Sequence, residues 1–493
     1  MNPLEALSMK KKLTRKNLFI VIIAFALMIL FIELKLPSAF TTLEKAELTQ
    51  YGQSAIGVLL FCLVLWATEA IPFHITAFLG VIFITALGIP DWSFQAIVKS
   101  GFGSDTAVFF IGVLAMSAVI TFSGLGKRIS IFILSVTGNN ASMIILGFLL
   151  AGVIISAWIT DMAVAAMLVP LAVSILKEEG CEPLKSNFGK ALLISCAFGP
   201  TIGGICTPAG SSSNVIAMDL MQKADIEINF LEWMKYGIPS ALLLVIPTWL
   251  VLLWLFKPEI THLKKSSEDL HNDFKALPKI SRDEIYTCII FLITIALWLL
   301  TPVLEPVIGF KIPTSMPALI AVCLFFLPGA ISIKWKEVES DISWSGIVLI
   351  LAGIGIGTVL DKTGAANWIA QILLGGIGGF TPLLQTFFII LIVCVMKIIF
   401  SSNAVTAVII IPIVIALAQN FGINPAILVL PAGITSSMAI IMVTSSPTNV
   451  IPFSAGYFTI GDMAKAGIII SIIASVLISV VMFTVGSVTG LYL

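Results

Sequence analysis

Charged residues are scarce in this chain of 493 residues, where Asp, Glu, Lys and Arg together make up 11%. Soluble proteins carry about 25% charged residues, so a water-soluble fold of this length could not cover its surface. The 27 basic and 27 acidic residues cancel, which removes the basic excess that binds nucleic acid. Because 58% of the residues are hydrophobic and the mean hydropathy is +1.09, the composition predicts an integral membrane protein.

Residues that build metal centres and enzyme sites are also few. The chain has three histidines and seven cysteines, with no CxxC pair, and it contains no HExxH, GxSxG or GxxxxGK[ST] motif. The apolar segments hold no DDxxD motif and no Ser/His pair, and no TVGYG filter occurs. We therefore expect no resident cofactor, and we keep an intramembrane enzyme or a channel only as an alternative.

Apolar segments of about 20 residues, the length that spans a bilayer, are numerous. We expect eleven full-length spans, at 18–36, 52–70, 73–89, 105–125, 188–220, 237–256, 284–303, 314–330, 346–361, 425–458 and 466–491. Two further segments, 141–177 and 380–418, are interrupted by polar residues at Thr160-Asp161 and Ser401-Ser402-Asn403. We interpret these two as re-entrant hairpins. The expected fold is therefore an all-α polytopic membrane protein with about 11 transmembrane helices plus two re-entrant helical hairpins.

The distribution of basic residues favours one orientation. With the N-terminus in the cytoplasm, 19 of the 27 Lys and Arg residues fall inside and seven outside, in agreement with the positive-inside rule. The remaining one, Lys397, lies within the membrane. We expect a multi-pass protein of the plasma (inner) membrane with a cytoplasmic N-terminus. The bias of basic residues does not test the two hairpins. If each hairpin were two membrane-spanning helices instead, the remaining loops would still lie on the same sides of the membrane.

Four segments of the first half recur in the same order in the second half. They pair 72–77 with 313–318, 109–130 with 347–368, 158–170 with 400–412, and 206–216 with 444–451. By the span count the first hairpin opens to the inside and the second to the outside, so the repeats are inverted. Inverted repeats with interrupted helices at matching positions are typical of secondary transporters whose site lies near the bilayer midplane.

The interruptions also indicate the chemistry of such a site. A broken helix frees backbone N–H and C=O groups, which are tolerated in the membrane only where they line a protein cavity. Helix N-termini at a break suit carboxylates, whereas freed carbonyl oxygens suit Na⁺. The neutral groups beside the breaks, which could bind an anion without a fixed positive charge, are those of Thr207, Asn214, Ser402, Asn403 and Thr444.

Together these motifs resemble the divalent anion/sodium symporter family of dicarboxylate transporters, over nearly the whole chain. The resemblance is carried by the two hairpin tips, the loops CTPAGSSSNVI (206–216) and TSSPTNVI (444–451), and Trp66-Ala-Thr-Glu69-Ala-Ile-Pro72 with Thr76-Ala77. It implies a homodimer in which each protomer has a fixed scaffold and a transport part that slides across the membrane as an elevator.

The resemblance also divides the chain into parts. The scaffold helices would occupy 1–140 in the first repeat and 284–379 in the second. The transport parts, each with a hairpin and a broken helix, would occupy 141–256 and 380–493. The hydrophilic segment 257–283 would then be a cytoplasmic linker between the halves.

The same resemblance assigns the site residues. In the family, the hairpin tips and the Thr/Pro loops bind the substrate carboxylates, and Na⁺ lies behind each tip. The matching substrate-binding positions here are Thr160, Asp161, Ser402, Asn403, Thr207, Pro208, Thr444 and Pro447. The positions that would balance charge or hold a cation are Lys397, Asp161, Asn214 and Asn449.

The tips depart from the Ser-Asn-Thr pattern of the family. The first reads Thr160-Asp161-Met162 and the second Ser402-Asn403-Ala404, so each lacks one hydroxyl and the first has a carboxylate in place of an amide. A carboxylate repels an anionic substrate unless a cation neutralises it. Lys397, five residues before Ser402, lies about 7.5 Å from it along a helix. Because intramembrane ionisable residues are usually functional, we hypothesise that Lys397 replaces a bound Na⁺.

The expected activity is therefore exchange of C4–C5 dicarboxylates (succinate, malate, fumarate, 2-oxoglutarate) without Na⁺. A Na⁺-coupled symporter of the same fold remains the first alternative, and Na⁺ would then be a required ion. Lys397 could instead only hold the hairpin, by pairing with Asp161 or with a carbonyl, and Asp161 could be a cation ligand or a proton carrier. The expected partners are the dicarboxylate, the lipid bilayer and a second copy of the chain, with no nucleic acid.

Overall fold

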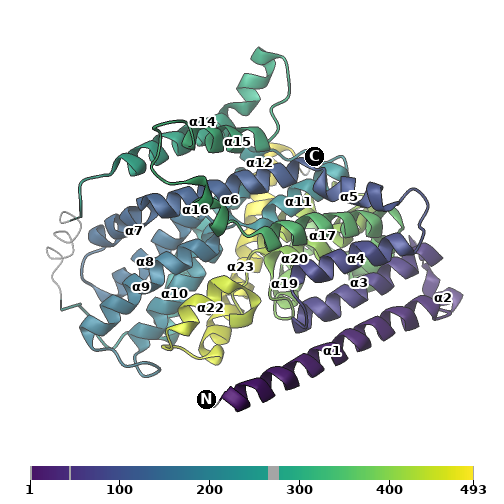
Figure 1. Ribbon diagram of the computed structural model, residues 1–493, viewed down its shortest axis with the longest axis horizontal. Coiled ribbons are helices and arrows are strands. Elements are labelled where there is room, and N and C mark those ends of the chain that lie inside the picture. The colour runs from purple at the N-terminus through teal and green to yellow at the C-terminus, as the bar shows by residue number, and fades with distance from the viewer. Residues whose placement is uncertain (1–2, 44–45, 265–276, 492–493) are drawn as a thin grey trace.

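The computed structural model describes residues 3–43, 46–264 and 277–491, which are almost entirely helical (Figure 1). Residues 265–276 of the expected linker lie outside the described residues. One short antiparallel pair of strands, β1 (Thr42–Leu43) and β2 (Ala46–Glu47), aligns Thr42 with Glu47. The expected all-α class is confirmed.

The helices before the linker are α1 (Pro3–Glu33), α2 (Ser38–Thr41), α3 (Gln50–Thr68), α4 (Phe73–Ala86), α5 (Phe94–Phe102), α6 (Asp105–Ser123), α7 (Leu125–Val136), α8 (Ala141–Ser156), α9 (Asp161–Glu179), α10 (Asn187–Gly203), the 3₁₀ turn η1 (Pro208–Gly210), α11 (Ser212–Lys223) and α12 (Phe230–Leu255). The helices after it are α14 (Arg282–Ile308), α15 (Ser315–Phe325), α16 (Trp335–Asp341), α17 (Trp344–Lys362), α18 (Ala365–Leu374), η2 (Gly375–Ile377), α19 (Pro382–Met396), α20 (Asn403–Phe421), α21 (Ala426–Ser436), η3 (Val443–Ser445), α22 (Pro447–Ser454) and α23 (Ile460–Thr489).

From α3 onwards the described α-helices of the two halves follow the same order, while the 3₁₀ turn η2 occurs only in the second half. The hairpin α8–α9 corresponds to α19–α20, and the broken helix α10–η1–α11 corresponds to α21–η3–α22. Two equivalent pairs also match in length, since α6 and α17 have 19 residues each, as do α9 and α20. The structure therefore reproduces the repeat that the four sequence matches indicate.

Several expected spans are shorter or broken. Within the described residues, eight helices are long and apolar enough to cross a membrane. The segments 73–89 and 314–330 form α4 and α15, of 14 and 11 residues, which rise only about 21 and 17 Å. The segments 188–220 and 425–458 are each divided into two helices around a non-helical stretch. Broken and short helices are expected around a cavity, because there the backbone need not be satisfied within one helix.

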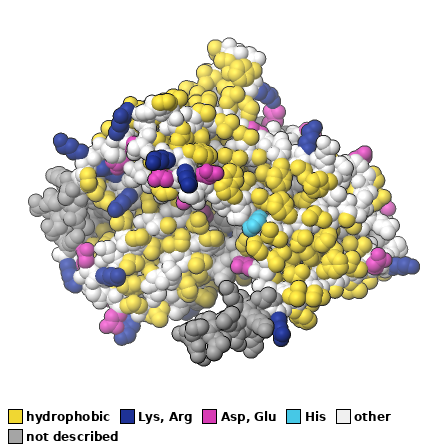
Figure 2. All heavy atoms as spheres, in the orientation of Figure 1, with side chains coloured by type: hydrophobic (Ala, Val, Ile, Leu, Met, Phe, Trp, Pro, Cys, Tyr) yellow, Lys and Arg dark blue, Asp and Glu magenta, His cyan; other side chains and the backbone are white. Residues whose placement is uncertain are grey.

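The surface between the helix ends is largely apolar. Figure 2 shows large yellow areas between scattered charged side chains. Among the exposed apolar residues are Leu30, Trp254 and Val307 on α1, α12 and α14. These side chains suit a hydrocarbon environment rather than water.

Helices of each half pack on helices of the other half. Helix α6 packs on α15 and α17 on α4, while α9 packs on α22 and α20 on α11. In Figure 1, α3, α4, α5 and α17 lie together on the right, α7 to α10 lie on the left, and α20, α22 and α23 lie between them. Each hairpin is therefore completed by the broken helix of the other half.

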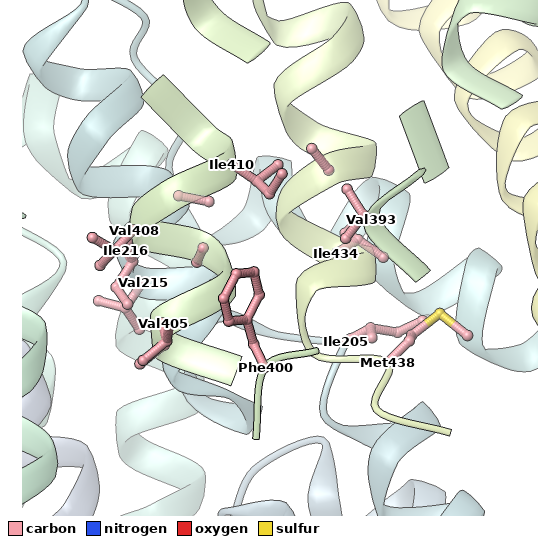
Figure 3. Close-up of a cluster of buried hydrophobic side chains, with 14 of the residues drawn as sticks. Ile205, Val215, Ile216, Val393, Phe400, Val405, Val408, Ile410, Ile434 and Met438 are labelled. Carbon is pink, nitrogen blue, oxygen red and sulfur yellow. The ribbon is translucent and has the colours of Figure 1, made fainter. Parts of the chain in front are cut away.

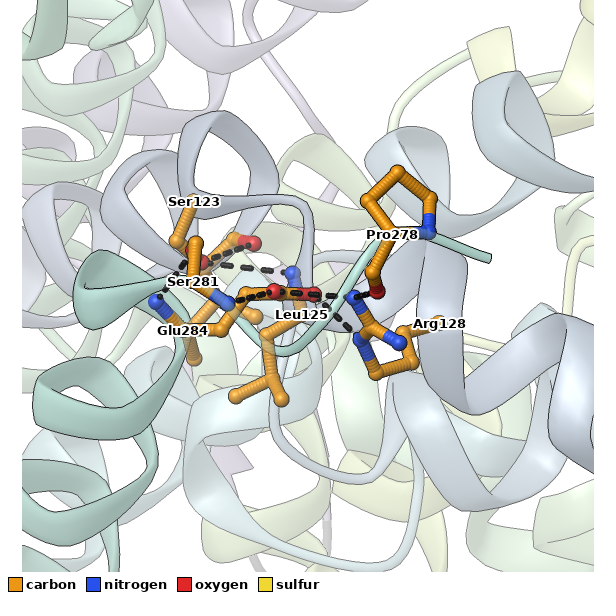
Figure 4. A network of polar contacts seen from close by, with 7 residues as sticks. Ser123, Leu125, Arg128, Pro278, Ser281 and Glu284 are labelled. Atoms are coloured by element: carbon orange, nitrogen blue, oxygen red, sulfur yellow. Dashed lines mark hydrogen bonds and ion pairs between the residues drawn. The ribbon is translucent and has the colours of Figure 1, made fainter. Parts of the chain in front are cut away.

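An ion pair holds the start of α14, the first helix of the second half. The Arg128 guanidinium donates from Nε and Nη2 to the two carboxylate oxygens of Glu284 at 2.6 and 3.1 Å, and Nη2 also donates to the Pro278 carbonyl at 2.9 Å (Figure 4). The Glu284 carboxylate also accepts the Ser281 N–H, which completes a capping box on α14. The start of α7 is thereby held beside the start of α14.

Helices α8 and α10 approach closely through small residues. A Cβ atom at Gly203 would lie 2.4 Å from the Val153 carbonyl oxygen, and one at Gly199 would lie 2.7 Å from the Leu149 carbonyl oxygen. Gly152 faces the same contact from α8, where a Cβ would meet Pro200 at 2.6 Å. Small residues four apart are a common device for close helix packing in membranes. This contact fixes the first hairpin to the first broken helix.

We expect Gly203→Ala to destabilise the protein, because the added methyl group must displace the Val153 backbone. Overpacking of this kind costs about 1–3 kcal/mol. The measurement is the melting temperature of the detergent-purified protein. Gly376→Ala is the control, since nothing lies within 4 Å of a Cβ there. Equal melting temperatures for the two variants would contradict the close packing of α8 and α10.

Candidate functional site

The first hairpin tip lies between α8 and α9. Its backbone turns at 157–160, and α9 begins at Asp161. The Thr160 N–H donates to the Ser117 hydroxyl of α6 at 3.4 Å, and the Asp161 carboxylate accepts the Met162 N–H at 2.9 Å. The Thr207 hydroxyl donates to the Ala157 carbonyl at 2.5 Å, which ties this tip to the break of α10–α11.

The second tip is built in a similar way between α19 and α20. Ser402 is the N-cap of α20, and its hydroxyl accepts the Val405 N–H at 3.5 Å. The Ser445 hydroxyl, in the break of α21–α22, donates to the Lys397 carbonyl at 2.5 Å. In both halves a hydroxyl from the break therefore satisfies a carbonyl at the end of the first hairpin helix.

Two buried asparagines hold the broken helices in shape. Asn214 Nδ2 donates to the Gly204 and Thr207 carbonyls at 2.7 and 2.8 Å, which lie ten and seven residues earlier. Asn449 Nδ2 donates to the carbonyls at the same two spacings, those of Ala439 and of Met442, the latter at 3.0 Å. Both side chains are 0% exposed. These amides supply the donors that the carbonyls lose when the helix ladder is interrupted.

Lys397 is buried behind the second tip. It is 1% exposed, and its ammonium donates to Asn403 Oδ1 at 2.7 Å and to the Ser445 carbonyl at 3.3 Å. Asn403 Nδ2 in turn donates to the Asp161 carboxylate at 3.4 Å. Lys397 and Asp161 are therefore connected through the Asn403 amide.

An apolar cluster supports this tip from behind. Phe400 lies just before the tip, and Val405 and Val408 of α20 lie beside Val215 and Ile216 of α11 (Figure 3). The cluster excludes water from the back of the second tip. Electrostatic interactions are stronger in such a dry environment, so the Lys397 charge acts over a longer range.

A cavity of about 750 Å³ lies between the two tips. Four helices begin at its wall, because α9, α20, α11 and α22 start at or beside the lining residues 161–163, 402–404, 211–212 and 446–448. Helix N-termini present free N–H groups and the positive end of the helix dipole. The cavity can therefore bind anionic groups, and its volume is typical of small-molecule sites.

The cavity also shows that the two halves run in opposite directions. It is lined by Phe73 at the start of α4, by Thr121 near the end of α6 and by Ser343 before α17. Helix α3 therefore ends on the face where α6 ends, and α14 begins on that face beside Arg128. Helix α14 is the counterpart of α3. Because α3 ends on this face and α14 begins on it, the two helices run in opposite directions and the repeats are inverted.

Most of the residues expected to bind substrate line the cavity. They are Thr160, Asp161, Pro208, Ser402, Asn403 and Pro447. Thr207 and Thr444 do not line it, since Thr207 is buried against the tip and Thr444 lies exposed in η3. Of the expected charge-balancing residues, Asp161 lines the cavity, whereas Lys397, Asn214 and Asn449 lie behind its wall.

Further polar residues that the sequence reasoning had not selected as binding residues also line the cavity. Among them are His74, Asp341, Ser212 and Thr448. Ser212 and Thr448 are part of the duplicated loops, so the motif itself was the available signal. Asp341 lies at the end of α16, and no local pattern distinguishes it from a surface residue.

This architecture defines the class of protein. Two hairpins and two broken helices, related by inverted repeats and enclosing a cavity, form the type of site that secondary transporters use. The comparisons with known proteins agree. Residues 14–491 match the family described as the sodium:sulfate symporter transmembrane region. The chain therefore belongs to this family, which confirms both the family resemblance of the motifs and the expectation of a transporter rather than an enzyme.

Individual relatives match over most of the chain. It is 27% identical to the sodium-dependent dicarboxylate transporter SdcS of Staphylococcus saprophyticus, over 89% of this chain and 87% of that protein. It is 28% identical to an uncharacterized transporter of Haemophilus influenzae, over 89% of this chain and 93% of that protein. The solved structure of the Alcanivorax borkumensis YdaH transporter superposes with a TM-score of 0.59 at 15% identity, over 87% of this chain and 99% of that one. The last likeness supports the fold alone.

We expect Asn214→Ala to destabilise the first broken helix. The substitution leaves the Gly204 carbonyl buried without a donor and the Thr207 carbonyl with only the Gly210 N–H, at a cost of about 1–3 kcal/mol for the unpaired group. The melting temperature of the purified protein should fall clearly below that of Ser454→Ala, which removes an exposed hydroxyl bond within α22. If the two variants melt together, the amide is not what holds the break.

Proposed function

We propose that this protein carries C4–C5 dicarboxylates, such as succinate, malate, fumarate and 2-oxoglutarate, across the plasma membrane by Na⁺-independent exchange. Dicarboxylate is the substrate in the printed name of the Staphylococcus saprophyticus relative. The four helix N-termini at the cavity provide the complementary donors for two carboxylate groups. The position of Lys397 is the observation that favours exchange over Na⁺-coupled symport.

The Lys397 ammonium has the surroundings that suit a small cation. Its acceptors are a side-chain amide oxygen of the tip, from Asn403, and a backbone carbonyl of the broken helix, from Ser445. Carbonyl oxygens of unwound helices are the groups that coordinate Na⁺ in secondary transporters. Because this group is covalently attached, it moves with the site on every crossing. Transport then needs no cation from solution, and the driving force comes from the dicarboxylate gradients.

We further propose that the cavity crosses the membrane by an elevator movement within a homodimer. The transport parts 141–256 and 380–493 would move against the scaffold parts 1–140 and 284–379. Two polar contacts hold the tips to the scaffold, between Thr160 and Ser117 and between Ser401 and Glu69 at 2.5 Å. Further contacts across the same boundary, such as Thr106 with Asp219 at 2.6 Å and Lys223 with the Ser100 carbonyl at 2.5 Å, would also have to break in this movement. With the N-terminus in the cytoplasm, the cavity opens to the cytoplasmic side.

Na⁺-coupled symport is the second candidate. The Staphylococcus saprophyticus relative is named as sodium-dependent. The Oδ1 atoms of Asn214 and Asn449 are buried and have no hydrogen-bond partner among the described residues, so each could accept a cation. Under this alternative, Asp161 would serve as a cation ligand or proton carrier.

Counterflow in proteoliposomes separates the two candidates. We expect labelled succinate to enter vesicles loaded with malate at the same rate in Na⁺ and in choline buffer, and to enter empty vesicles slowly. Uptake that requires an inward Na⁺ gradient and ignores internal malate would establish symport instead. No saturable flux under either condition would reject transport of these diacids.

The variant Lys397→Met tests the fixed charge. It keeps the length of the side chain but removes the ammonium, so we expect exchange to fall at least about tenfold or to become dependent on added Na⁺ or Li⁺. Lys235→Met is a matched control, because Lys235 lies on α12 outside the lining of the cavity. Wild-type exchange rates in the Lys397 variant would contradict the proposed role of the charge.

A further inference from the structure

The two hairpin tips face the cavity with different chemistry. Asp161 and Asn403 occupy equivalent positions, each as the first residue of the second hairpin helix. The Asn403 amide is occupied on both sides, because its oxygen accepts from Lys397 and its nitrogen donates to Asp161. The carboxylate of Asp161 therefore remains the charged group that the tips present to the cavity.

The charge of the whole cavity is negative. Among the described residues that line it, none is Lys or Arg, while Asp161 and Asp341 are both acidic. The Lys397 ammonium is 1% exposed and lies behind Asn403, so it cannot reach a substrate directly. A dianion entering this cavity gains the helix N-termini but approaches two carboxylates. A substrate that carries its own positive charge would avoid that penalty.

The Asp161 carboxylate also keeps free capacity for a donor. Its oxygens accept the Met162 N–H and the Asn403 amide. A carboxylate offers about four lone-pair positions, so capacity remains for a further donor from the cavity side. Asp161 is half-buried and no salt bridge joins it to a cation within the described part of the chain. An ammonium group is the donor that would balance its charge best.

We propose that the preferred substrate of this site is a diacid that carries a protonated amino group beside one carboxylate, and that Asp161 binds this ammonium. The inference rests on the proposed function, because it assumes that a C4–C5 diacid enters this cavity. One substrate carboxylate lies at the second tip and the broken-helix N-termini, and the ammonium lies at the first tip. The asymmetry between Asp161 and Asn403 thus matches the asymmetry of an amino diacid.

The wild-type protein can test this without any substitution. L-Malate and L-aspartate have the same carbon skeleton, with a hydroxyl in one and an ammonium in the other. In malate-loaded proteoliposomes we expect aspartate to reach half-maximal uptake at a concentration about tenfold to a hundredfold lower than malate, which is the range for one hydrogen bond to a charged group. N-Acetyl-aspartate, which lacks the positive charge, should compete no better than succinate.

The variant D161N tests the assigned residue. We expect the advantage of aspartate over malate to fall at least about tenfold, because the carboxylate that pairs with the ammonium is gone. D161E keeps the carboxylate and should retain a preference for aspartate. Asp361→Asn, at the end of α17, is the control for a surface acid and should keep the wild-type ratio. The ratio of two substrates is informative even if a variant is less abundant.

The outcomes separate this inference from the proposed function. If malate and succinate exchange but aspartate is taken up no better than malate, the inference is overturned and dicarboxylate exchange stands. If D161N lowers uptake of all diacids equally, or only removes a pH dependence of succinate exchange, then Asp161 does not bind the ammonium group of the substrate. If no diacid shows counterflow, the proposed function itself fails.

Discussion

The need to satisfy backbone groups in the absence of water governs this structure. Each broken helix leaves carbonyl oxygens without their usual N–H partners, and in the membrane such groups cannot turn to solvent. The chain solves this with one device used twice, an asparagine amide that donates to carbonyls ten and seven residues earlier. The hydroxyls of Thr207 and Ser445 perform the same task for the hairpins. The cavity exists because these side chains allow four helices to begin inside the membrane.

The symmetry of this framework makes its exceptions informative. The amides of the broken helices are equivalent in both halves, whereas the charged residues are not. Lys397 is the C-cap of the first hairpin helix, where the first half has an alanine, Ala157, and Asp161 has an asparagine, Asn403, as its counterpart. A duplicated backbone therefore carries one fixed cation and one fixed anion on opposite tips, joined by a single amide. Function is expected at such places, because nothing in the fold requires the two halves to differ there.

The sequence predicted the parts of the fold that depend on periodicity and duplication. Hairpins and the inverted order followed from interrupted hydrophobic runs and from four matched segments, whereas the hydrophobic runs alone predicted unbroken spans at 188–220 and 425–458. Six of the eight expected binding residues line the cavity. Contacts between residues far apart in the chain were not predictable in the same way. Whether Lys397 meets Asp161 directly or through Asn403 depends on side-chain reach and on where α22 packs. Asp341 belongs to a short helix whose place at the cavity is set by tertiary packing alone.

The crossed pairing of the two halves has a consequence for synthesis of the chain. The second helix of the first hairpin, α9, packs on α22, which is translated only near the end of the chain. The ribosome therefore releases the first hairpin into the membrane long before its partner exists. During that interval its freed backbone groups and Asp161 must be tolerated by lipid, insertion machinery or non-native contacts. Pairings so distant in sequence are slow to form, so the last helices to be made complete the site that the first hairpin began.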